Sequence, residues 1–72
     1  MTAKITGVVI DKGTQKKKDG SSVVYTALFI PQDGDTVKVT GLDVDLKESQ
    51  YKELSVMVNI RPYNSTLYIN AI

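Results

Sequence analysis

Most apolar residues of this chain recur at every second position, and short turn sequences interrupt the alternation. Successive side chains of a strand point to opposite faces, so a period of two predicts several short antiparallel strands. The turn sequences include Asp33-Gly34 and Asn64-Ser65, two pairs that are common in tight hairpins. We therefore expect an all-β fold.

Five strands are predicted, and they cover residues 4–12, 23–30, 36–41, 55–63 and 66–72. In the first strand, Val8 and Ile10 can share the inner face with Ile5 only if the register slips near Gly7. We expect a bulge or a sharp bend at this glycine, because a glycine in mid-strand often marks one. Pro31 follows the second strand and ends it, since proline cannot donate to a sheet ladder.

The alternation assigns a face to each side chain of the later strands. The residues expected inside are Val24, Leu28, Ile30, Val37, Val39, Val56, Val58, Ile60, Leu67, Ile69 and Ala71. The second strand then turns a second apolar row outward, which consists of Val23, Tyr25, Ala27 and Phe29. A contiguous apolar patch on the surface indicates an interaction site.

A change of period after Leu42 predicts one short helix. Asp45 is suited to cap a helix that begins at Leu46, and Glu48 three residues later completes a capping box. We expect a helix over residues 46–53, with Leu46, Tyr51 and Leu54 on its apolar side. Three strands, a helix and two strands follow the order of the OB fold, a five-stranded Greek-key barrel. The prediction is one OB-like domain over residues 1–72.

The chain contains no histidine and no cysteine. Catalysis by a Ser-His or Cys-His pair is excluded, because the base of either pair is absent. The acidic pairs Asp33/Asp35 and Asp43/Asp45 fall in predicted turns or at the helix cap, where short acids serve the backbone. We expect no enzymatic activity, no cofactor and no metal site.

The small size of the chain predicts self-association. A domain of 72 residues removes only about 60% of its unfolded surface from water, and no disulfide can add stability here. A homodimer is therefore expected. No apolar run reaches the length of a signal peptide or a membrane span, so we predict a cytoplasmic protein that does not contact a membrane.

Charge is segregated along the chain although the net charge is only +1. Residues 1–20 hold five lysines and two acids, whereas residues 33–54 hold six acids and three lysines. Residues 13–22 lack any apolar side chain and predict an exposed basic loop, which we expect to project as a hairpin tip. The candidates for binding backbone phosphates are Lys12, Lys16, Lys17 and Lys18. The alternative is an ordinary solvated loop.

Aromatic residues on the outer strand faces are candidates for base stacking. Tyr25 and Phe29 lie on one face of the second strand, roughly 13 Å apart at the usual rise per residue, and unstacked bases of any sequence can stack on such rings. Arg61, Tyr63 and Tyr68 take outer positions of the final hairpin and could bind a phosphate or a base. Two alternatives remain: the strand rings form a subunit interface, or Tyr63 packs on Tyr68.

The basic loop and the tyrosine that follows it resemble the small single-stranded DNA-binding proteins of filamentous phages and related mobile elements. The resemblance rests on residues 12–20, a glycine-bounded lysine loop, and on Tyr25 within residues 22–26. It implies an OB-like barrel that assembles as a dimer, and a phage protein of DNA replication.

We expect sequence-tolerant binding of single-stranded nucleic acid, with DNA favoured over RNA. The alternative is an assembly module whose exposed aromatic strand is a subunit interface.

Overall fold

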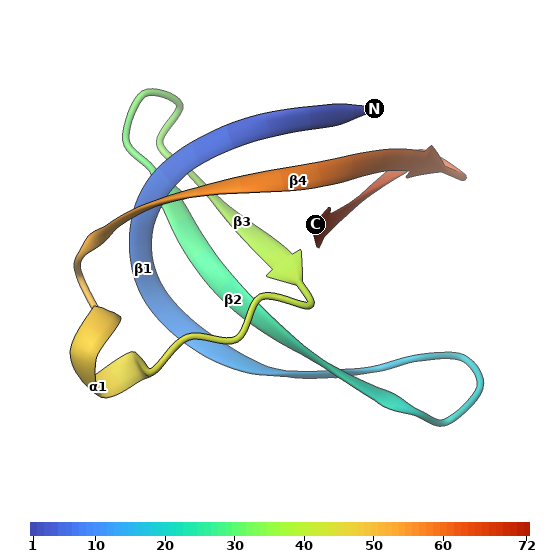
Figure 1. Ribbon diagram of the computed structural model, residues 1–72. Helices are drawn as coiled ribbons and strands as arrows, with labels where there is room; N and C mark the ends of the chain where they lie inside the picture. The colour runs from blue at the N-terminus through green and yellow to red at the C-terminus, as the bar shows by residue number, and fades with distance from the viewer.

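The predicted strands form a closed barrel in the computed structural model, which describes residues 1–72 (Figure 1). The elements in chain order are β1 (Thr2–Lys16), β2 (Ser22–Ile30), β3 (Asp35–Thr40), α1 (Leu46–Ser49), β4 (Glu53–Tyr63) and β5 (Thr66–Ala71). Around the barrel the strands follow the order β1-β2-β3-β5-β4. This order, with the helix between β3 and β4, confirms the OB-type fold.

Strand β1 is the longest element and serves both sides of the barrel. Its first half pairs antiparallel with β4, from Thr2 opposite Asn59 to Val8 opposite Glu53. Its second half pairs antiparallel with β2, from Val8 opposite Phe29 to Lys16 opposite Ser22. The strand curves around the barrel between these two halves (Figure 1).

The register slip of β1 lies between Val9 and Asp11, so the prediction of a slip at Gly7 was wrong in position. The first half of the strand alternates without interruption, and it buries Val9 in place of the predicted Val8 and Ile10. Gly7 has a different role. A Cβ atom on Gly7 would lie 2.8 Å from the carbonyl oxygen of Phe29, so only glycine lets β1 pass this close to β2.

The centre of the barrel is small. The four residues of the core cluster, Val9, Leu28, Val39 and Val58, come from β1, β2, β3 and β4 and are fully inaccessible to solvent. Thr26 is buried beside them, and its hydroxyl donates a hydrogen bond to the carbonyl oxygen of Leu42. Because only 7 of the 72 residues are buried, most of the apolar contact comes from half-buried side chains around this centre.

Leu67 was expected inside the barrel, but 64% of it is exposed. The reason is the way in which the barrel closes. β3 and β5 run parallel and share a single bridging pair, Thr40 opposite Asn70. Leu67 lies towards the start of β5, where no strand pairs with that edge.

The helix is shorter than predicted and covers four residues, Leu46–Ser49. Asp45 caps it as expected, since its side chain accepts a hydrogen bond from the backbone N–H of Lys47 at 3.0 Å. The chain then leaves the helix because the N–H of Tyr51 donates to the carbonyl oxygen of Val9 at 2.6 Å. Tyr51 has a positive φ of 65° and is 74% exposed, so its expected place on the apolar side of a helix was wrong.

The basic loop is a hairpin end whose two strands extend further than predicted. β1 continues to Lys16 and β2 begins at Ser22, so only residues 17–21 form the turn. We call residues 16–22 the wing. The N–H of Lys17 donates to the carbonyl oxygen of Ser21 at 2.8 Å, and Gly20 takes a φ of 90°, which explains the glycine.

Candidate nucleic-acid interface

A groove of about 600 Å³ lies between the wing and the β4–β5 hairpin. Lys16, Lys17 and Lys18 line it from the wing, and Tyr63 and Tyr68 line it from the hairpin. Both hairpins project from the same side of the barrel, on the right in Figure 1, away from α1 and the β2–β3 turn. Five of the residues predicted to bind nucleic acid therefore meet around one groove.

The sequence of the β4–β5 turn fixes the position of the two tyrosines. Asn64 and Ser65 have φ values of 49° and 64°, as a two-residue hairpin turn of the primed type requires. This turn pairs Tyr63 with Thr66 and places Tyr68 opposite Arg61. The register of the hairpin thus brings both rings and the guanidinium to the same end of the two strands.

The two tyrosine rings contact each other but stay accessible. Their centroids are 6.5 Å apart and their planes are tilted by 54°, which is a favourable geometry for an aromatic pair. The pair shows the packing of Tyr63 on Tyr68 that the sequence left open as an alternative to ligand contact. Because 61% of Tyr63 and 46% of Tyr68 remain exposed, packing leaves ring surface free to contact a ligand.

Arg61 lies beside the groove. It lines a smaller hollow of about 300 Å³ with Pro62, and Tyr63, Tyr68 and Asn70 line both this hollow and the main groove. The guanidinium makes no salt bridge, and neither do the three wing lysines, because the only salt bridge of the protein is between Lys12 and Asp43. These four positive charges have no carboxylate in contact, so they are available to an anionic ligand.

Lys12 does not line the groove. Its ammonium lies 2.7 Å from the Asp43 carboxylate and donates to the carbonyl oxygen of Val44 at 3.0 Å. Its cross-strand partner is the buried Thr26, so it belongs to the inner row of β1 and reaches the β3–α1 connection. In the structure Lys12 holds that connection to the barrel.

Tyr25 and Phe29 belong to the row of β2 opposite to that of the buried Thr26 and Leu28. The prediction that this whole row is exposed was wrong, because Ala27 in the same row is buried at 6% exposure and Tyr25 is half-buried. The ring of Tyr25 lies over Gly13 of β1, where a Cβ atom would come within 2.9 Å of its hydroxyl. Phe29 is 36% exposed and lies opposite Val8 and Thr36. Neither ring lines the groove, although Tyr25 pairs with Thr40, which does.

Several groove residues were missed by the sequence analysis. Asn70, Thr40 and Gln15 line the groove between the wing and the tyrosines. Nothing local in the sequence singles them out, because the groove joins two hairpins that are far apart in the chain. Lys38 lines an adjoining hollow and could have been found, because its place between the buried Val39 and the half-buried Val37 turns it outward beside Tyr25.

The turn of the wing is held by a carboxylate. Asp19 accepts hydrogen bonds from the Ser21 hydroxyl at 2.6 Å and from the Ser21 N–H at 2.9 Å. The hydroxyl bond, followed by the backbone bond, lowers the pKa of Asp19 from its ordinary value. The charged carboxylate therefore orders the segment that carries the lysines.

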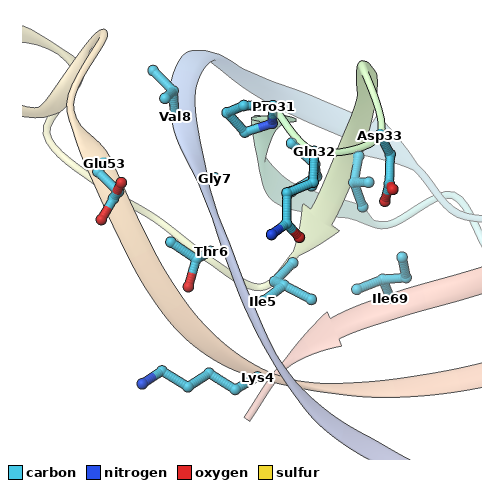
Figure 2. Close-up of a pocket in the computed structure, with 12 residues that line it drawn as sticks. Lys4, Ile5, Thr6, Gly7, Val8, Pro31, Gln32, Asp33, Glu53 and Ile69 are labelled. Carbon is cyan, nitrogen blue, oxygen red and sulfur yellow. The ribbon is translucent and has the colours of Figure 1, made fainter.

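A second hollow of similar volume, about 600 Å³, lies between the first half of β1 and the β2–β3 turn (Figure 2). Its apolar side chains include Ile5 and Ile69, and Gln32 extends its amide toward Ile5 in the close-up. The charged residues around it are one lysine and two acids, Lys4, Asp33 and Glu53. This charge balance does not favour a polyanion, whereas the three lysines of the wing groove do.

No helix in the structure has the length and hydropathy that crossing a membrane demands. No protein-family model, curated protein or solved structure matches the chain.

Proposed function

We propose that the protein binds single-stranded DNA without sequence preference in the groove between the wing and the β4–β5 hairpin. One observation carries the proposal: three lysines without ion pairs face two exposed tyrosines across one groove. A groove that combines positive charge with aromatic rings suits a single strand, since phosphates and unstacked bases alternate along it.

The two walls have different tasks in this proposal. The wing lysines and Arg61 neutralise phosphates, and Tyr63 and Tyr68 stack on bases. Tyr25 and Phe29 extend the aromatic surface along the outer face of β2. The function is binding without catalysis, and it fits phage DNA replication in the cytoplasm, where single strands are exposed.

The phosphate contacts can be tested through the salt dependence of binding. Each phosphate contact on a single strand contributes about 0.7 to the slope of log K against log salt concentration. Replacing Lys16, Lys17 and Lys18 with Gln should lower the slope for a dT oligomer by about 2, measured by fluorescence anisotropy. The matched control replaces Lys4, Lys47 and Lys52 with Gln, which removes equal charge outside the groove. An equal loss of slope in both variants would contradict the proposal.

The stacking contacts can be tested with a tyrosine pair. Tyr68→Ala should weaken binding of a dT oligomer by about 1–3 kcal/mol, the usual contribution of one stacked base. Tyr51→Ala is the matched control, because Tyr51 is 74% exposed and does not line the groove. The same titrations with poly-rU and duplex DNA should give weaker binding than poly-dT. Equal affinity for duplex DNA would reject a single-strand site.

A second candidate function is self-assembly through an exposed aromatic surface. It is favoured by the small buried core and by the exposure of Tyr63, Leu67 and Tyr68 on one hairpin. For these two reasons we propose that the protein forms a homodimer, whether its function is self-assembly or DNA binding. Sedimentation of the free protein measures the dimer, and tyrosine fluorescence during titration with dT separates the two roles. Rings in a subunit interface should not be quenched by the oligomer.

A further inference from the structure

Lys38 is an exposed residue of β3 whose ammonium nitrogen lies over the ring of Tyr25, 5.0 Å from its centroid. The ring itself rests on Gly13, since an added Cβ there would lie 2.9–3.2 Å from the hydroxyl end of the tyrosine. The absence of a side chain at Gly13 therefore leaves room for the ring, and Lys38 covers it.

The ammonium of Lys38 has no carboxylate partner. Asp11 lies on the same outer row, since both Asp11 and Lys38 pair with Ala27, yet the two side chains form no salt bridge. Asp11 instead accepts a hydrogen bond from the N–H of Lys12 at 2.8 Å. The contact with Tyr25 is thus a cation–π interaction at an exposed site, which is weak compared with a charge-assisted bond to a phosphate.

Lys38 also lines a hollow that continues the proposed DNA-binding groove. This hollow of about 430 Å³ shares Gln15, Thr40 and Tyr68 with the wing groove. A single DNA strand that passes from the wing lysines over Tyr68 therefore reaches Lys38 next.

We propose that Lys38 is a phosphate-binding residue that covers Tyr25 in the free protein and leaves the ring when a single strand binds. The proposal rests on the function proposed above and adds a residue and a movement to it. When the ammonium moves to a phosphate, the ring of Tyr25 is uncovered, and a base can take the place of the cation. One side chain thereby couples a phosphate contact to a stacking contact.

The first test is the salt dependence of a charge series. Lys38→Gln should lower the slope for a dT oligomer by about 0.7, and Lys38→Arg should restore it because the charge is kept. Lys52→Gln is the control, since Lys52 is exposed and lines neither hollow. A slope in Lys38→Gln equal to that of the wild type would overturn the proposal and leave the proposed function intact.

The second test follows the movement directly. Protons of the ε-methylene of Lys38 should show an upfield ring-current shift in the free protein, measured by NMR, and should lose it on addition of a dT oligomer. Retention of the shift in the saturated complex would show that Lys38 stays on the ring, which overturns the proposal. If the wild-type protein does not bind the oligomer at all, the proposed function fails and the role of Lys38 fails with it.

Discussion

Gly7 and Gly13 of β1 both lie close to atoms of β2, but these neighbouring atoms differ in how far they can move. At Gly7 the nearest atom to an added Cβ is the backbone oxygen of Phe29 at 2.8 Å, with Ile30 Cδ1 at 2.9 Å. At Gly13 the nearest atoms are the outer end of the Tyr25 side chain, at 2.9–3.2 Å. A backbone in a sheet cannot shift cheaply, whereas a half-buried ring can turn aside.

Replacing each glycine with alanine should therefore change the free energy of unfolding by amounts that differ in sign or size. Gly7→Ala should reduce the free energy of unfolding by about 1–3 kcal/mol, the usual cost of overpacking. Gly13→Ala should change the free energy of unfolding by less than about 1 kcal/mol. Alanine lowers the entropy of the unfolded chain, and this gain in stability offsets the cost of displacing the ring. Urea unfolding of both variants measures the difference. Equal losses would mean that the ring of Tyr25 is held as firmly as the backbone.

Lys12 shows that a lysine in a basic segment can have a structural role and no contact with the groove. It belongs to the same basic segment as the wing lysines, but it is paired with Asp43. Lys12→Gln should leave the affinity and the salt slope for a dT oligomer unchanged. It should lower the free energy of unfolding by less than about 1 kcal/mol, because the pair is largely solvated. Titration and urea unfolding check the two parts, and a loss of salt slope would place Lys12 in the DNA-binding surface.

Among the elements, the wing has a turn that is held by one carboxylate, that of Asp19. The pKa of Asp19 in the folded protein is lowered from the ordinary value of 3.8. Because the pKa is lowered, the hydrogen bonds of the Asp19 carboxylate stabilise the turn fully when the pH is above the ordinary pKa. This stabilisation is lost as the pH falls through the lowered pKa.

Ser21→Ala should raise the pKa of Asp19 back toward 3.8, because the Ser21 hydroxyl is the largest cause of the shift. NMR titration of the Asp19 carboxyl measures the change, and the Ser21 N–H reports the order of the turn. If the pKa stays where it is in the wild type, the hydroxyl is not the cause.

The elements themselves could largely be predicted from the sequence, since strands and caps are encoded by near neighbours. The period of two located all five strands, and Asp45 located the start of the helix. The end of the helix could not be predicted, because it depends on a hydrogen bond from Tyr51 to Val9 of β1, which is distant in the sequence. The same holds for the candidate site: its residue types were recognisable, but the fold alone brings the wing and the β4–β5 hairpin to the same groove.

For the whole molecule, the small core sets a narrow margin of stability. At roughly 0.05–0.15 kcal/mol per residue, 72 residues give about 4–11 kcal/mol. Leu28 is fully buried, and its truncation to Ala should cost about 2–5 kcal/mol, a large part of that margin.

A dT oligomer should offset part of this loss. At a free concentration of 100 times Kd, a ligand that binds only the folded state adds about 2.7 kcal/mol. The melting temperature of Leu28→Ala should therefore rise on addition of dT, as measured by circular dichroism. The triple lysine variant of the wing should show a much smaller rise at the same dT concentration. No rise for either protein would contradict binding to the folded barrel.

The junction of β3 and β5, which closes the barrel, lies at the groove. β3 and β5 are joined by one bridging pair, Thr40 and Asn70, and the Thr40 hydroxyl contacts the Asn70 side chain across it. Both residues also line the groove. A DNA strand bound in the groove would contact both β3 and β5 beside this bridging pair. Binding of DNA and closure of the barrel would then stabilise each other. Amide hydrogen exchange in β3 and β5 should then slow more than in β1 when DNA is added.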